Sequence, residues 1–198
     1  MRSGHGLRGG VSRTRARLGD QLLAVFIANN AHLDQVVSAL RPQDWDTRCH
    51  HPMGAEPVRT LIDVRITELA MHGWDMRSRF DPQTTLSAES KPALLQTIPR
   101  AVRRAFRPDT SRTTPLCYRF AVTGPDATMP DIVLSREGGR CAPASDSSAD
   151  VTFRCPVATA LLVLFGRLAV DAALRDGQLS YDGPPELVAT FGQAFVGG

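Results

Sequence analysis

The sequence contains almost no lysine, few cysteines and no long apolar run. Lys91 is the single lysine among 23 basic residues, and this bias, with abundant alanine, indicates a GC-rich genome, not a function. The net charge of +3 is too small to indicate a nucleic-acid-binding protein. The longest apolar run, Ala158 to Phe165, is far shorter than the ~20 residues of a membrane-spanning helix. We therefore expect a protein that binds neither nucleic acid nor a membrane.

The cysteines are scattered along the chain without a CxxC pair, at Cys49, Cys117, Cys141 and Cys155. This distribution fits a reduced cytosolic protein better than a disulfide framework or a zinc knuckle. No apolar core follows the first arginines before Leu22, as a signal peptide would require. Both observations predict a cytoplasmic location.

The N-terminal half is predicted to be helical after a flexible basic arm. Residues 1–19 are rich in glycine and arginine and have no period, and no aromatic residue is available to stack on bases. Residues 20–107 show three segments with helical spacing of apolar residues, the first with Asp20 as its N-cap. Pro99 should kink or divide the third of these helices, which runs from about residue 87 or 90 to 106.

The polar stretch 107–115 separates this helical part from a segment with a different period. Apolar and other residues alternate from Leu116 to Val122, which is typical of a strand. Further strands are predicted at 131–136, 149–154 and 178–181, and helices at 156–165, 170–175 and 185–195. Strands followed by helices predict an α+β domain over residues 115–198.

The helix predicted over residues 59–77 carries four polar groups in one stripe: Arg65, Glu68, His72 and Asp75. Glu68 and His72 are four residues apart, so their side chains meet on one face of the helix. Such a stripe can bind a metal or an anion, or it can be a solvated row of salt bridges. The opposite face is apolar and should pack against partner helices, through Leu61, Ile62, Ile66, Leu69, Ala70 and Trp74.

The segment TELAMHGWDM resembles the "R..E..vHgwD" helix of the mycothiol-dependent maleylpyruvate isomerase family, which belongs to the DinB-like metal-binding helical bundles. The preceding PQDWDTRCHHPMGAEPVRTL is similar to that family's approach to this helix. Farther on, DVTFRCPVATALLVLFGRLAVDAALRDGQLSYDG resembles the family's C-terminal domain, which is related to sterol carrier proteins. The resemblance implies a DinB-like helical bundle, incomplete at its N-terminus, followed by a small sterol-carrier-like α+β domain.

This resemblance implies that Glu68 and His72 bind a divalent metal together with a second histidine from an earlier helix. We expect the metal to be zinc. His5 stands at about the right distance before Glu68, although the surrounding glycines disfavour a helix. Catalytic zinc sites commonly use three protein ligands. Asp75, or one of the loop histidines His50 and His51, is the alternative third ligand.

The resemblance also implies roles for Arg65, Asp75 and Arg167 in catalysis. The two arginines would suit substrate carboxylates, because a guanidinium pairs with a carboxylate through two hydrogen bonds. Arg167 stands in LLVLFGRLAV, where the family has Gly-Arg between helices. A helix-end arginine that bonds the last backbone carbonyls is the alternative interpretation.

The predicted function is a metal-dependent, mycothiol-dependent isomerase or S-transferase that acts on a small electrophilic acid. In such an enzyme the metal would lower the pKa of the thiol of mycothiol. The alternatives are a non-catalytic module or a degenerate paralogue that binds an apolar ligand in the C-terminal domain. The missing N-terminal helix should leave an apolar groove, which predicts a homodimer.

Overall fold

The computed structural model describes residues 16–51, 54–123, 128–144 and 148–195. The chain folds into two compact units that divide between Arg59 and Thr60. The division falls in the first turn of the helix α3 (Val58–Arg77), so the predicted helical domain of residues 20–107 does not coincide with one unit. Throughout the described ranges, no helix combines the length and apolarity that crossing a membrane requires.

The first unit contains the helix α2 (Leu22–Ser38), preceded by the 3-10 turn η1 (Gly19–Gln21). Asp20 lies within that turn and Gln21 is the N-cap, without a side-chain hydrogen bond, so the prediction of Asp20 as the cap is wrong. A second 3-10 turn, η2 (Pro42–Asp46), leads to a short antiparallel pair of β1 (Arg48–Cys49) and β2 (Glu56–Pro57).

The second unit begins with the rest of α3, which is followed by the helix α4 (Lys91–Ala105). α4 is continuous with Pro99 inside it, so the proline does not divide it. Its apolar stripe is buried, with Leu94, Ile98 and Val102 fully covered. The stripe packs against the sheet strand β5 (Gly138–Ala142) and the helix α5 (Val157–Leu164), and this packing places α4 in the same unit as the sheet.

α3 packs on the core of the second unit through Thr67, Ala70, Met71 and Trp74. The Thr67 and Thr97 hydroxyls lie 2.9 Å apart and link α3 to α4. The predicted apolar face of α3 is therefore partly wrong, since Leu69 is 52% exposed. A residue one position from Ala70 points about 100° away around a helix and misses the contact surface.

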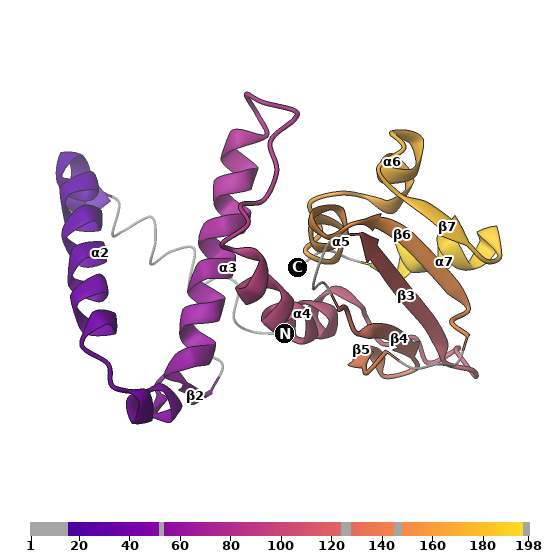
Figure 1. Cartoon of the computed structure of the whole chain (residues 1–198), viewed down its shortest axis with the longest axis horizontal. Helices are drawn as coiled ribbons and strands as arrows, with labels where there is room; N and C mark the ends of the chain where they lie inside the picture. Colours follow the sequence, from indigo (N-terminus) through magenta and orange to yellow (C-terminus); the bar gives the residue numbers. More distant parts are fainter. Residues whose placement is uncertain (1–15, 52–53, 124–127, 145–147, 196–198) are drawn as a thin grey trace. The chain divides into compact units, whose positions relative to one another are not determined.

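The sheet of the second unit has five strands in the order β5-β4-β3-β6-β7 (Figure 1). Only β3 and β6 run parallel, and the other neighbours are antiparallel. The strands are β3 (Leu116–Thr123), β4 (Asp131–Ser135), β5 (Gly138–Ala142), β6 (Val151–Pro156) and β7 (Ser180–Asp182). The predicted α+β class is confirmed.

Strand β5 was not predicted, because GGRCA shows no apolar alternation. It forms because a two-residue turn folds the chain back on β4, with Ser135 opposite Gly138. Gly139 is needed there, since a Cβ at this position would lie 2.8 Å from the Phe106 side chain.

Three short helices complete the second unit: α5 (Val157–Leu164), α6 (Val170–Arg175) and α7 (Pro185–Ala194). The core between sheet and helices contains a cluster of aromatic rings. Phe191 of α7 is fully buried and contacts the rings of Phe106, Tyr118, Phe120 and Phe153, at centroid distances of 4.9 to 6.0 Å. Such edge-on and tilted pairs are the favoured aromatic arrangements.

Candidate functional site

The end of helix α5 positions Arg167. The helix stops at Leu164, and Gly166 takes a φ of 72°, which an L side chain rarely adopts. The Gly166 amide donates to the Val163 carbonyl at 3.0 Å, and the Arg167 amide donates to the Leu162 carbonyl at 2.8 Å. These two bonds form the Schellman arrangement that commonly ends a helix. The Gly-Arg pair singled out in the sequence is therefore the turn that presents the Arg167 side chain.

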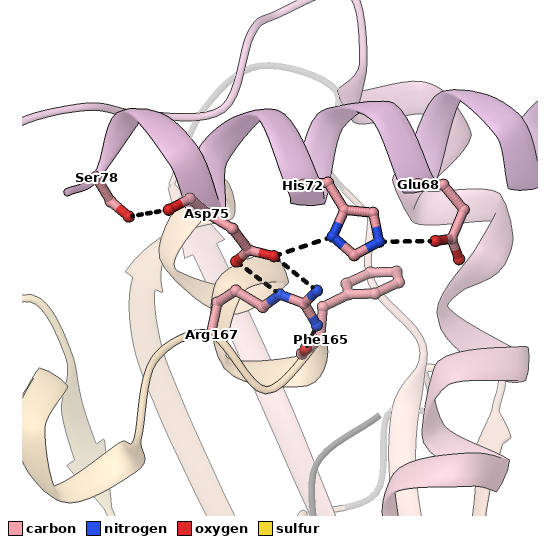
Figure 2. A network of polar contacts seen from close by, with 6 residues as sticks. All are labelled: Glu68, His72, Asp75, Ser78, Phe165 and Arg167. Carbon is pink, nitrogen blue, oxygen red and sulfur yellow. Dashed lines mark hydrogen bonds and ion pairs between the residues drawn. The ribbon is translucent and has the colours of Figure 1, made fainter. Parts of the chain in front are cut away.

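Arg167 binds Asp75 of α3 through two parallel hydrogen bonds (Figure 2). Nε donates to Oδ1 at 3.1 Å, and Nη2 donates to Oδ2 at 3.1 Å. Nη1 also donates to the backbone carbonyl of Phe165 at 2.8 Å. The Arg167 side chain is only 19% exposed, and that of Asp75 is 38% exposed. Paired hydrogen bonds between charged groups are among the stronger ones in proteins.

His72 lies between two carboxylates on the same face of α3 (Figure 2). Its Nδ1 is 3.2 Å from Asp75 Oδ2, and its Nε2 is 3.1 Å from Glu68 Oε2. A neutral imidazole has one N–H, so it can donate only one of these bonds, and the protonated ring donates both. The predicted stripe of Glu68, His72 and Asp75 is thus a hydrogen-bonded row that ends at Arg167. Arg65 is half-buried on the same helix, three residues before Glu68.

The Asp75 carboxylate is stabilised in its charged form. Partial burial acts to raise its pKa, but the hydrogen bonds and charge of Arg167, with a further contribution from His72, hold the pKa below its ordinary value. Asp75 is therefore ionised near neutral pH and cancels the charge of Arg167 at contact distance.

A cavity of about 830 Å³ opens beside Arg167 in the second unit. It is walled by the α5–α6 connection, α6, Tyr181 of β7 and α7, and its lining is mostly apolar, including Leu168, Val170, Leu174 and Val188. Among the described lining residues only Arg167 and Asp171 are charged. Asp171 accepts a hydrogen bond from Arg175 at 2.9 Å. The arrangement suits a ligand that is largely apolar.

The described residues do not form a complete metal site, because no three histidine, cysteine, aspartate or glutamate side chains converge in the described ranges. Glu68 and His72 are hydrogen-bonded to each other, and Asp75 is paired with Arg167. His5 lies outside the described residues. His50 and His51 belong to the first unit. Metal binding through Glu68 and His72 stays a prediction.

The cysteines do not supply a reactive thiolate in the second unit. Burial raises the pKa of Cys141 and of Cys155 to about 11, and burial with the nearby Asp131 raises that of Cys117. These thiols are protonated at neutral pH.

The sequence predicts the polar row and Arg167 but not the cavity. Leu174 and Val188 fall in predicted helices, and nothing in their spacing distinguishes the wall of a cavity from a filled core. The signal in the sequence is the Gly166-Arg167 break between two apolar helices, which a third helix follows, because small-molecule sites often lie between helices.

Two family models match the chain. The mycothiol maleylpyruvate isomerase N-terminal domain matches residues 2–77, and the SCP-2 sterol transfer family matches residues 98–196. The comparison with curated proteins gave no match.

Among solved structures, a UbiJ-SCP2 ubiquinone synthesis protein is 21% identical, with a TM-score of 0.40, over 52% of this chain and 94% of that one. Sterol carrier protein 2 like 2 from Aedes aegypti is 14% identical, with a TM-score of 0.35, over 55% of this chain and 100% of that one. Sterol carrier protein-2 from the same organism, in complex with the C16 fatty acid palmitate, is 17% identical with a TM-score of 0.35, over 52% and 90%.

Proposed function

We infer the function from one premise: the chain belongs to the SCP-2 sterol transfer family through residues 98–196, and the mycothiol maleylpyruvate isomerase N-terminal domain matches ahead of that segment. We propose that the C-terminal half binds an apolar small molecule in the cavity beside Arg167. The observation that carries this proposal is the cavity itself, about 830 Å³ in volume with a mostly apolar lining. Small-molecule sites typically measure roughly 300–1,000 Å³ and are largely apolar with a few polar groups.

The binding would be driven by removal of apolar surface from water, roughly 25 cal/mol for each Å² buried. Leu168, Leu174 and Val188 supply that surface from three different segments of the wall. Arg167, Tyr181 and Gln193 supply the polar groups that would orient one end of a ligand.

A titration with a neutral fluorescent probe of apolar sites tests this proposal. Ala189 lines the cavity from α7 and is exposed, so Ala189→Trp should fill the cavity without disturbing the core. Glu186 is an exposed residue of the same helix and does not line the cavity, so Glu186→Trp is the matched control. We expect Ala189→Trp to weaken probe binding at least about tenfold, roughly 1.4 kcal/mol. Equal binding by both variants would place the ligand elsewhere.

A second function is a metal-dependent, mycothiol-dependent isomerase or S-transferase acting on a small electrophilic acid. The match over residues 2–77 favours it, as does the row of Glu68, His72 and Asp75 that ends at Arg167. The described residues do not complete a metal site, so a further ligand would be required. Elemental analysis of the purified chain and of His72→Ala provides the test. Stoichiometric zinc that is lost in the variant supports this function, and a metal-free parent chain contradicts it.

A further inference from the structure

We propose that the cavity prefers a neutral apolar ligand over the carboxylic acid of the same chain length, and that Asp75 sets this preference by occupying Arg167. The inference rests on the proposed binding of an apolar molecule in the cavity. It assigns to that molecule a head group, namely a hydroxyl or carbonyl that accepts a hydrogen bond.

Two charged side chains, Arg167 and Asp171, are among the described residues that line the cavity. Arg167 is the only basic side chain among the described lining residues, so it is the only lining group that could neutralise a bound carboxylate. Asp171 is the only acidic one, and its pairing with Arg175 lies at an exposed surface. A buried carboxylate without a cationic partner is unfavourable, because it loses its hydration.

Arg167 is already paired with a carboxylate. Its Nε–Nη2 edge, which pairs side-on with a carboxylate, is filled by Asp75. Asp75 does not line the cavity, so it holds the guanidinium from outside the ligand space. A ligand carboxylate would have to displace Asp75 or bind to a pair that carries no net charge.

The polar row continues beyond Asp75 with His72 and then Glu68. With Arg167, these side chains are two acids and two bases, so together they carry no surplus positive charge even when His72 is protonated. Glu68 and Asp75 therefore offset the positive charge that the four side chains could present to a bound acid.

Arg167 still has hydrogen-bonding capacity for a neutral group. A guanidinium has five N–H donors, and three of them are used, two by Asp75 and one by the Phe165 carbonyl. The remaining donors belong to Nη1 and Nη2. A hydroxyl or an ester carbonyl can accept from them without bringing a second negative charge beside Asp75.

The test compares hexadecanol with hexadecanoate as competitors of a neutral fluorescent probe, at pH 8 and with the full chain. We expect the parent chain to bind the alcohol at least about tenfold more tightly than the acid. Asp75→Asn keeps the size of the side chain and removes its charge, so it should shift the acid-to-alcohol affinity ratio at least about tenfold towards the acid. Asp75→Glu should keep the preference of the parent chain.

Glu68→Gln is the matched control, because it removes a negative charge from the same helix face without contacting Arg167. It should shift the ratio less than Asp75→Asn does. If the parent chain binds the acid more tightly than the alcohol, the inference is overturned. An unchanged acid-to-alcohol affinity ratio in a folded Asp75→Asn variant overturns it as well. Failure of the parent chain to bind either competitor or the probe instead overturns the proposed cavity function.

Discussion

Arg167 and Asp75, which are 92 residues apart in sequence, pair through two hydrogen bonds of 3.1 Å. The pair joins the last turns of α3 to the connection between α5 and α6. The positive φ of Gly166 forms the turn that directs the Arg167 side chain towards Asp75. It also decides what the cavity beside Arg167 can recognise, because a guanidinium that is already neutralised offers hydrogen bonds but little net charge.

The contribution of this pair to stability can be measured by a double-mutant cycle of Arg167→Ala and Asp75→Ala. Exposed ion pairs contribute little, but this pair is partly buried and has two parallel bonds, so we expect a coupling energy of about 1 kcal/mol. Urea unfolding of the four proteins gives this value. Arg175 and Asp171 form a one-bond pair on the surface and serve as the control cycle, with a smaller coupling expected. Equal coupling energies in the two cycles would show that the burial and paired bonds of Arg167 and Asp75 add nothing to the free energy of unfolding.

Stability should depend on pH through Asp75. Its pKa is lowered in the folded chain against the opposing effect of burial, chiefly by Arg167, so the folded state favours the ionised form. This stabilisation is complete above the unfolded pKa of about 3.9 and is lost as the pH falls through the lower folded value. The difference in unfolding free energy between the parent chain and Asp75→Asn should therefore shrink as the pH falls below about 4. Urea titrations across this range measure it, and a difference that grows on acidification would contradict the prediction.

Trp74 should stabilise α3 by packing and by one hydrogen bond. It packs against the core while only half-buried, and its Nε1 donates to the Thr84 carbonyl at 3.2 Å. Trp74→Ala should thus cost about 2 kcal/mol, less than the roughly 3–5 kcal/mol of a fully buried aromatic residue. Trp74→Phe should cost about 1 kcal/mol, since it mainly removes the hydrogen bond.

Phe80 provides the control for Trp74, because it follows closely after α3 in the sequence and is 91% exposed. Phe80→Ala should change the unfolding free energy by less than about 0.5 kcal/mol. If the two alanine variants melt alike, the assignment of Trp74 to the core contact is incorrect.

Two glycines should respond in opposite ways to alanine. In β5, a Cβ at Gly139 would lie 2.8 Å from the Phe106 ring, so Gly139→Ala should destabilise by about 1–3 kcal/mol. In α7, a Cβ at Gly192 would meet no atom within 4 Å, so Gly192→Ala should stabilise by up to about 1 kcal/mol. Chemical denaturation of the two variants measures both changes in unfolding free energy. If Gly139→Ala left the unfolding free energy unchanged, Phe106 would be free to move away from the added methyl group.

Local patterns were sufficient for much of the second unit. The period-two alternation predicted β3, and the helical stripe of Leu94, Ile98 and Val102 predicted the buried face of α4, because both patterns follow from the geometry of one element. The same rule predicted that Glu68, His72 and Asp75 share one face of α3. β5 could not be predicted in this way, because its pairing with β4, and not its own composition, makes it a strand.

Residues a few positions apart are enough to predict the strongly periodic secondary elements, the polar stripe of α3 and the Gly-Arg break after α5. Three features become evident only in the folded chain: Asp75 meets Arg167, Leu69 is left exposed, and apolar residues of α6 and α7 line a cavity. These features depend on how separate elements pack. A leucine that fills a core and a leucine that walls a cavity have the same spacing, and only the position of the neighbouring helices distinguishes them.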